Sequence, residues 1–315
     1  MSSWSRQIHE TCLRANGKLA VLRSVKFLSR STLDLLYKLT VRSVVDYGLI
    51  IYYQTLKVTE KARLDQLQYR AAKLCTGALH FSSQRKLEDD LAWESIAERA
   101  DFLGLSFFQK VHLGETRPLI RGCMSKLKPG LNSRSADFGC YELFPPLGTN
   151  FTNSYFPYYT KAWNSLKNHL KGENDISLFK SNLKNVFKPK KQKHFSRGSK
   201  RGNSLLTQLR VGRSLLNSHG YSINLADSDQ CLCSRPETVS HFFNQCFLYQ
   251  EERQLLVSKI EKIIPKFSRL SDKRKTEILL NGINLNSDEP DSRNVPLTFT
   301  VQHYILQTRR FNSPP

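Results

Sequence analysis

Apolar residues recur every three or four positions through roughly the first 125 residues, and no stretch alternates for long as a β-strand would. This spacing predicts a helical bundle with short loops. The expected helices are one near the N-terminus, one from Thr32 toward Tyr53 capped by Ser31, one around residues 64–74 that ends at Gly77, and one over about 93–113.

The second of these helices carries a possible core stripe. Leu35, Leu36, Leu39 and Val44 fall at helical spacing, so we expect them to face the bundle interior. Asp46-Tyr47-Gly48 follows the stripe. We interpret this tripeptide as packing or a bend, and not as the position of a catalytic base.

Residues 126–160 change character, because proline, glycine and polar turn formers replace the helical pattern. We interpret them as an irregular linker. Helical spacing returns afterwards, in segments that we place at residues 159–170, 177–187, 204–216, 248–264, 272–280 and 299–310. The predicted fold is therefore mainly α, with a helical bundle over residues 1–125, the linker over 126–160 and a basic helical region over 161–315.

The charge balance adds a functional expectation. The chain of 315 residues has a formal net charge of +21, which favours a polyanionic partner. An anionic membrane surface is the competing partner, but no helix combines a basic face with a clean apolar face. The longest apolar stretch, residues 44–53, is far too short to span a bilayer, and the first residues lack the apolar core of a signal peptide.

Most of the candidate contacts to a polyanion lie in one segment. No Asp or Glu occurs between Ile176 and Ala226. Lysines and arginines there could neutralise phosphates of RNA or single-stranded DNA, with Phe187 and Phe195 as candidate stacking platforms for bases. The alternatives are a solvated linker, a nuclear import signal, and phenylalanines that pack in a core. The candidate cations are Lys184, Lys188, Lys190, Lys191, Lys193, Arg197, Lys200, Arg201, Arg210 and Arg213.

A Cys/His motif follows the basic segment. Cys231, Cys233, His241 and Cys246 have the spacing C-x-C-x7-H-x4-C, which could close around a tetrahedral zinc ion. Four protein ligands are typical of a structural zinc site. The alternative is three reduced core thiols and a hydrogen-bonded histidine. The Glu237-Thr238 pair, which precedes His241, could support the ligands or cap the short helix that carries His241.

The remaining cysteines argue against a disulfide-bonded protein, and the remaining acidic residues argue against a polymerase. Four cysteines are scattered singly, which is typical of a reduced intracellular protein, although nucleus and cytoplasm are not distinguished. Asp89-Asp90 is the only adjacent acidic pair that resembles a polymerase metal site. It lies in a helical, charge-rich context, so we expect a solvated helix face. We expect no enzyme activity from this chain.

The order of motifs resembles the C-terminal part of reverse transcriptases of non-LTR (LINE-type, jockey-like) retrotransposons. Leu36-Tyr37-Lys38-Leu39 with Val44-Val45-Asp46-Tyr47-Gly48 resembles the thumb segment of that family. Further segments resemble later family motifs in the same order, and these are residues 64–73, 153–156 with 162–166, 207–212, the Cys/His motif and 299–310. Leu166-Lys167 departs from the usual Leu-Pro.

The resemblance implies a thumb-like helical bundle followed by a nucleic-acid-binding region. No residue matches the Phe/Tyr-Ala-Asp-Asp metal site of the family palm, and the endonuclease is also missing. We therefore expect a remnant that binds RNA or single-stranded nucleic acid, with the missing polymerase portion as a possible partner in a longer product. The alternatives are a zinc-stabilised scaffold for protein interactions and a fragment that needs the palm in order to fold.

Overall fold

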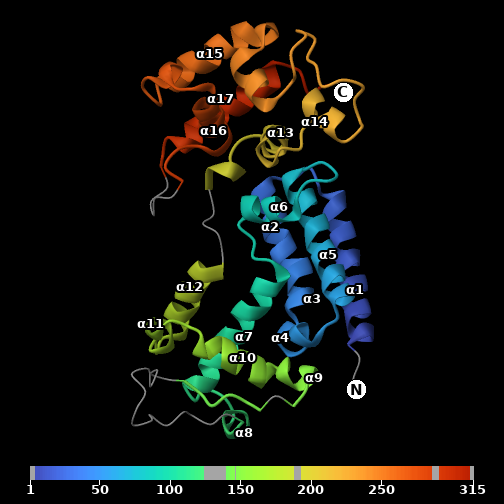
Figure 1. The fold of residues 1–315 in the computed structure, drawn as a ribbon, viewed down its shortest axis with the longest axis vertical. Coiled ribbons are helices and arrows are strands. Elements are labelled where there is room, and N and C mark those ends of the chain that lie inside the picture. Colours follow the sequence, from blue (N-terminus) through green and yellow to red (C-terminus); the bar gives the residue numbers. More distant parts are fainter. Residues whose placement is uncertain (1–3, 124–139, 146, 188–192, 286–290, 313–315) are drawn as a thin grey trace. The chain divides into compact units, whose positions relative to one another are not determined.

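The computed structural model describes residues 4–123, 140–145, 147–187, 193–285 and 291–312, and these parts are mainly α-helical (Figure 1). Within them an isolated antiparallel β-bridge joins Gln230 and Pro236. None of the described helices is both long enough and apolar enough to cross a bilayer. The mainly α fold expected from the apolar spacing is confirmed.

The chain divides into two compact units, and each unit is assembled from three separate segments. Unit 1 contains Met1–Ala20, Tyr37–Gln68 and Ala92–Lys190, and unit 2 contains Val21–Leu36, Tyr69–Leu91 and Lys191–Pro315. The predicted consecutive division at residues 125 and 160 differs from this arrangement. Apolar spacing shows which face of a helix is buried, but it does not show which distant segment covers that face.

The first half of the chain contains the expected run of helices. Gly77 ends the long α5 as predicted, because it adopts φ +68° and its backbone N–H closes onto the carbonyl of Lys73 at 2.8 Å. The elements are α1 Ser5–Ser24, α2 Arg30–Leu36, the π-helical η1 Tyr37–Arg42, α3 Ser43–Asp46, α4 Leu49–Tyr52, the 3-10 turn η2 Tyr53–Thr55, α5 Val58–Thr76, α6 Gln84–Leu91, α7 Ile96–His112 and α8 Pro118–Arg121.

The single helix predicted from Thr32 toward Tyr53 is wrong in its register. In the structure, α2 is capped by Ser29 and not by Ser31, because the Ser29 hydroxyl accepts from the Thr32 backbone N–H at 3.2 Å. The helical run that follows breaks at Gly48, which adopts φ +71°. The stripe members Leu35 and Leu39 are exposed. The residues that are buried instead recur at every fourth position, namely Leu33, Tyr37, Val41, Val45 and Leu49.

The π-helical turn η1 explains this register. A strict spacing of four residues runs ahead of the 3.6-residue period of an α-helix, so its members drift around the helix surface. A π-turn, closed by i→i+5 hydrogen bonds, winds more slowly and offsets that drift. The bend predicted at Asp46-Tyr47-Gly48 is confirmed, and the Asp46 carboxylate pairs with the Arg99 guanidinium at 2.7 Å.

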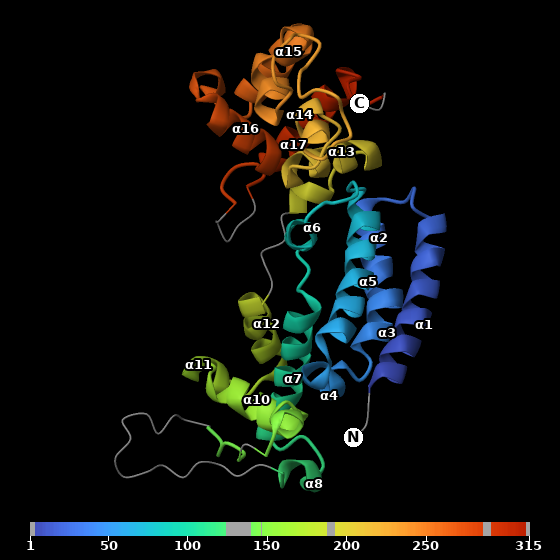
Figure 2. The same ribbon diagram turned by 45° about the vertical axis from the view of Figure 1, so that its right-hand side comes forward.

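Helix α7 organises the core of unit 1. It begins with a complete capping box, in which Ser95 and Glu98 bond each other's backbone N–H groups. Helices α10 Tyr155–Asn164 and α12 Ile176–Phe187 pack against it, and the short helices α9 Thr149–Thr152 and α11 Asn168–Lys171 flank α10 in sequence (Figures 1 and 2). The buried aromatic residues of this core are Phe108, Tyr141, Tyr159, Trp163 and Phe179.

The linker predicted over residues 126–160 is therefore wrong for its second part. Residues 126–139 lie outside the described residues. Residues 155–160 are helical, and Tyr159 is fully buried with its hydroxyl donating to the Ala100 carbonyl at 2.9 Å. The proline and glycine content of the region obscured an aromatic helix that completes the core of unit 1.

Two glycines in long helices of unit 1 offer a matched stability test. Replacing Gly104 of α7 by alanine places a Cβ about 2.0 Å from the Tyr159 ring, so overpacking should cost about 1–3 kcal/mol of unfolding free energy. Gly17 of α1 has no atom within 4 Å of an added Cβ. Gly17→Ala should be neutral or stabilising by up to about 1 kcal/mol. Denaturant titration of the two variants measures both effects. Equal shifts would contradict the close packing of α7 against α10.

Unit 2 is built around α17 Asn294–Gln307, which packs against α13 Lys200–Val211, α15 Gln250–Glu261 and α16 Asp272–Asn281 (Figure 2). Its buried residues form a continuous aliphatic and aromatic core that includes Leu209, Phe242, Ile260, Val301 and Tyr304. The shorter elements are η3 Lys193–Ser196, α14 Asn217–Ser222, the π-helical η4 His241–Gln245, η5 Phe247–Tyr249 and η6 Phe267–Arg269.

A buried charge cluster joins distant segments of unit 2. The Asp90 carboxylate pairs with the Arg30 guanidinium at 2.6 Å and also with Arg210, and all three side chains are at most 9% exposed. Arg30 donates to the Thr207 hydroxyl at 3.0 Å. The solvated face predicted for Asp89-Asp90 is thus confirmed for Asp89, which pairs with Arg85 at the surface, and wrong for Asp90.

Candidate metal centre

The first two candidate ligands lie on a tight loop. The backbone N–H of Cys231 donates to the Arg235 carbonyl at 2.7 Å, and that of Ser234 donates back to the Cys231 carbonyl at 2.8 Å. Ser234 adopts φ +63°, which reverses the chain. The Gln230–Pro236 bridge closes the base of the loop. This tight loop brings the sulfurs of Cys231 and Cys233 close to the other two candidate ligands.

The other two ligands lie on the π-helical turn η4 and at its end. The backbone N–H of Cys246 donates to the His241 carbonyl at 2.9 Å, an i→i+5 bond that suits a separation of five residues. The Thr238 hydroxyl accepts from the His241 backbone N–H at 3.1 Å, so Thr238 fixes the start of this turn. The helix-capping role proposed for the Glu237-Thr238 pair therefore belongs to Thr238.

The four side chains converge as a metal site requires. One ligand atom from each of Cys231, Cys233, His241 and Cys246 lies within 4.8 Å of all the others. The Cys231 and Cys246 sulfurs are 3.6 Å apart, and the Cys233 sulfur is 3.1 Å from His241 Nε2. A tetrahedral zinc ion separates two sulfurs by about 3.8 Å and a sulfur from a nitrogen by about 3.5 Å. This group could hold a metal ion after small shifts of the side chains, outward for the two short separations and inward for separations as long as 4.8 Å.

The protonation states of the free ligands show what the metal would change. Burial raises the pKa of the Cys231 thiol to about 12, and burial also raises the pKa of Cys246. Burial lowers the pKa of His241, so its imidazole is neutral and ready to bind a cation. Burial opposes ionisation of Cys233, but hydrogen bonds from the Arg235 backbone and from the Cys231 and Cys246 thiols together outweigh burial and lower its pKa. Loss of the other two thiol protons therefore needs the charge of a bound ion.

An ion pair anchors the ligand loop to the C-terminal part of unit 2. Glu237 is buried, and its carboxylate accepts from Arg310 Nε and Nη2 at 2.6 and 2.7 Å. The same carboxylate accepts from the Asn217 backbone N–H at 2.7 Å. Arg310 also donates to the Leu215 carbonyl at 2.9 Å. The loop between Cys233 and His241 is thus held from outside the Cys/His motif, which sequence spacing alone did not indicate.

The structure sorts the predicted phosphate contacts into several groups. Lys188, Lys190 and Lys191 lie outside the described residues, and Lys193 is described only as the start of η3. Lys184 on α12 and Arg197 are exposed. The others make internal contacts: Lys200 donates to the Cys75 carbonyl at 3.2 Å, Arg201 to the Asn312 side chain at 2.5 Å, and Arg213 to His219 at 2.9 Å.

Arg210 and the two candidate stacking residues occupy other positions than expected. Arg210 pairs with Asp90, donates to the Leu280 carbonyl at 2.9 Å, and stacks over Phe195 at 3.5 Å from the ring centroid. Arg210 is therefore turned away from solvent, and Phe195 is buried beneath it. Phe187 packs against the core of unit 1. The core alternative holds for both phenylalanines.

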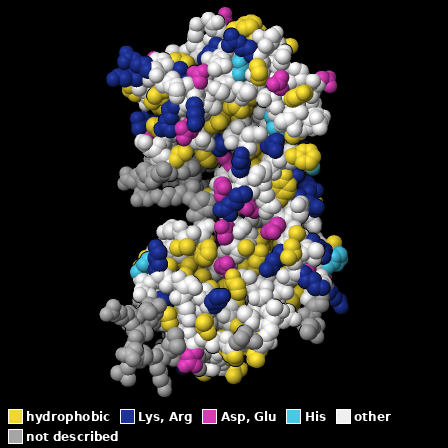
Figure 3. Space-filling view, viewed as in Figure 1, with side chains coloured by type: hydrophobic (Ala, Val, Ile, Leu, Met, Phe, Trp, Pro, Cys, Tyr) yellow, Lys and Arg dark blue, Asp and Glu magenta, His cyan; other side chains and the backbone are white. Residues whose placement is uncertain are grey.

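Two exposed apolar residues beside the ligands were missed in the sequence. Leu232 follows Cys231 and is 94% exposed, and Phe247 follows Cys246 and is 63% exposed. Exposed apolar side chains on both sides of a buried cluster provide a surface for a base or for a protein partner. The signal was available, because each residue is the immediate neighbour of a candidate ligand. On the face that Figure 3 shows, lysines and arginines are dispersed among apolar and acidic side chains.

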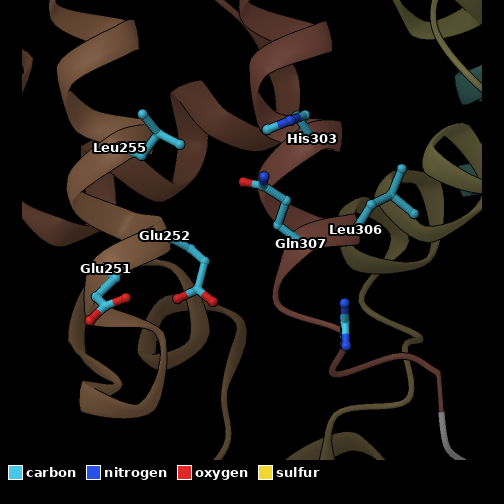
Figure 4. A pocket seen from close by; sticks show the side chains of 7 residues that line it. Glu251, Glu252, Leu255, His303, Leu306 and Gln307 are labelled. Atoms are coloured by element: carbon cyan, nitrogen blue, oxygen red, sulfur yellow. The ribbon is translucent and has the colours of Figure 1, made fainter.

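A hollow of about 560 Å³ lies between α15 and α17. In Figure 4, Glu252 and Leu255 on α15 face His303 and Gln307 on α17. Glu251 and Glu252 stand in the first turn of α15, where carboxylates stabilise the helix N-terminus. The lining has two carboxylates and one arginine, Arg309, and this balance of charge disfavours a polyanion.

Comparisons of the chain with protein-family models, with curated proteins and with solved structures give no match. The interpretation of the Cys/His cluster and of the cationic surface therefore rests on their own chemistry.

Proposed function

We propose that the chain binds RNA or single-stranded DNA through a region of unit 2 that is organised by a structural zinc ion. The observation that carries this proposal is the convergence of Cys231, Cys233, His241 and Cys246 in a chain with a net charge of +21. Neither feature alone is specific. Together they are typical of small metal-stabilised modules that contact nucleic acid.

The donor set supports zinc as the metal. Three sulfurs and one imidazole nitrogen are borderline-soft ligands, which suit zinc better than the oxygen-seeking Mg²⁺ or Ca²⁺. All four positions come from the protein, and three of the four residues are buried. A closed shell leaves no open position for a substrate or an activated water, so the proposed role of the ion is structural.

Exposed arginines of unit 2 support a nucleic-acid partner. Arg197 is exposed just before α13, Arg201 is exposed in the first turn of α13, and Arg235 is exposed on the C-x-C loop. The exposed ring of Phe247 adjoins the ligand Cys246. Cations that contact phosphates, combined with an aromatic surface for unpaired bases, favour a single strand over a duplex. The order of motifs further supports an origin as the thumb and C-terminal region of a non-LTR reverse transcriptase.

A salt titration of binding to an oligouridylate tests the proposal. The variant with Lys188, Lys190, Lys191 and Lys193 all replaced by alanine should bind more weakly and lower the slope of log K against log salt by about 0.7 for each lost contact. The matched control replaces Lys259, Lys262, Lys273 and Lys275, which removes the same charge elsewhere. If both variants lost the same affinity and salt slope, the lysines of residues 188–193 would contribute only through the net charge of the chain.

The same titration distinguishes the rival function. A scaffold that docks proteins through Leu232 and Phe247 would show no steep dependence of RNA binding on salt. The proposal would be refuted if the zinc-loaded wild type showed no measurable binding to RNA or single-stranded DNA at low salt. The protein-docking scaffold would then be the favoured function.

A further inference from the structure

A second hollow of about 350 Å³ adjoins the loop that carries the metal ligands. One wall is the connection from Gly212 to Leu216, and another is α14 with Ser218, His219 and Ser222. The third wall is the stretch Glu237-Thr238-Val239, which leads directly to His241. Four hydroxyl side chains and one arginine lie among the apolar residues of these walls, so the hollow can receive a polar, anionic group.

Arg213 is held in place by a relay of hydrogen bonds. His219 Nδ1 lies 2.7 Å from the Ser214 carbonyl, which can only accept, so Nδ1 carries the proton. His219 Nε2 then accepts from Arg213 Nη1 at 2.9 Å. One N–H of the guanidinium is used in this way, and four remain. The planar fork of an arginine is suited to two-point binding of phosphate oxygens.

The charge of Arg213 is not neutralised by a neighbour. Among the described residues no carboxylate forms an ion pair with it, and the acid that lines the hollow, Glu237, is already paired with Arg310. Hydroxyl donors complete the lining. Thr238 Oγ1 uses a lone pair to accept from the His241 backbone, which leaves its O–H free to donate, and Ser218 contributes a further hydroxyl.

We propose that this hollow binds one phosphodiester group of the nucleic-acid backbone, through the Arg213 guanidinium and the hydroxyls of Ser218 and Thr238. The inference rests on the proposed function and assigns one contact of it. A single uncompensated cation matches the single charge of a phosphodiester. A terminal phosphate monoester carries about −1.5 to −2 charges and would call for a second free cation.

The hollow and the metal loop share a wall, which ties phosphate binding to the metal. Thr238 lines the hollow and also fixes the start of the turn that carries His241 and Cys246. Removal of the ion should therefore loosen the third wall. In metal-free protein, the part of the affinity that depends on Arg213 should disappear, although Arg213 is not a ligand.

The test measures oligouridylate binding by the zinc-loaded chain, wild type against Arg213→Gln. We expect the variant to bind about tenfold more weakly, as for a charge-assisted hydrogen bond, and to lower the salt slope by about 0.7. Arg269→Gln is the matched control, because Arg269 is exposed and lines no part of this hollow. Zinc content and melting temperature should be the same in all three proteins.

A strand with one uncharged methylphosphonate linkage identifies the contact. When the uncharged linkage occupies the position that Arg213 contacts, wild type should bind the strand more weakly than the unmodified strand. Arg213→Gln should bind both strands almost equally, because this variant has already lost the contact to that phosphate. Strands with a 5′-phosphate and a 5′-hydroxyl should bind alike. A clear preference for the 5′-phosphate that vanishes in Arg213→Gln would overturn the phosphodiester in favour of a terminal phosphate.

The outcomes separate this inference from the proposed function. If the wild type binds RNA and Arg213→Gln matches Arg269→Gln in affinity and salt slope, the hollow is not a phosphate site, although the chain binds nucleic acid. If the wild type does not bind at all, the proposed function itself fails. Arg213→Lys is expected to keep most of the salt slope while losing affinity, because charge remains but the fork is lost.

Discussion

Asp90→Asn should destabilise unit 2 by about 3–5 kcal/mol of unfolding free energy, the typical cost of removing one partner from a buried ion pair. The reason is that Arg30 and Arg210 would remain buried with no carboxylate between them. Asp89→Asn is the matched control, since its partner Arg85 and its own carboxylate are about half exposed. Asp89→Asn should lower the free energy of unfolding by only about 0–1 kcal/mol.

Denaturant unfolding of the two variants measures the difference. If Asp90→Asn cost no more than Asp89→Asn, the buried cluster would be contradicted. A triple variant with Arg30→Met, Arg210→Met and Asp90→Leu should recover much of the loss, since apolar groups of similar volume can replace a buried ionic cluster. Such a recovery would show that Asp90→Asn destabilises unit 2 because it leaves buried charges unpaired.

The pH dependence of stability follows from the same carboxylate. Burial alone would raise the pKa of Asp90, but the charges of Arg30 and Arg210 outweigh burial and lower it below the ordinary value for aspartate. The stabilisation is therefore fully present above that ordinary pKa and is lost as the pH falls through the lowered folded value. Asp90→Asn should flatten this acid limb of the stability curve, whereas Asp89→Asn should leave it unchanged.

Purified wild-type protein should contain about one zinc ion per chain, and Cys233→Ser should lose it. Structural zinc sites contribute about 10–16 kcal/mol of apparent binding free energy, so chelation should unfold the ligand loop. Cys123→Ser is the matched control, because Cys123 is an exposed thiol outside the cluster. Metal analysis by mass spectrometry checks all three proteins, and equal zinc in wild type and Cys233→Ser would refute the site.

Acid should release the metal as protons compete for the thiolates. The buried Cys231 and Cys246 thiols have raised pKa values in the free site, so they take protons back readily once the ion leaves. Zinc release should therefore be cooperative, with loss of metal and loss of local structure occurring over the same pH range. Separate transitions would show that the loop is folded without the ion.

Local signals in the sequence predicted much of the fold. Helix α16 was expected over residues 272–280 and runs over Asp272–Asn281, because Ser271 caps its first turn and Gly282 follows its last. The start of α7 was predictable from the Ser95–Glu98 spacing of a capping box, although the helix was placed three residues early. These features are read within a few residues of each helix end.

The failures have a common physical cause, which is pairing at long range. Asp90 stands 60 residues from Arg30 and 120 from Arg210, and nothing in the local pattern of α6 distinguishes it from Asp89. The Cys/His group was recognisable because its four members lie in one short stretch. Its anchor was not, because Arg310 lies 73 residues from Glu237. The exposed stripe on α2 and η1 was misplaced because a π-turn has no sequence signal as strong as the 3.6-residue period.

The interleaved units have a consequence for the chain as it leaves the ribosome. Residues 21–36 and 69–91 are made early, but the rest of unit 2 begins only after residue 190. Asp90 therefore emerges 120 residues before Arg210, a wait of roughly ten seconds at typical rates of synthesis. During that time its carboxylate and the apolar faces beside it lack their final cover. Ribosomes stalled before α13 should carry nascent chains that are cleaved by protease in residues 69–91, and those stalled after α17 should not.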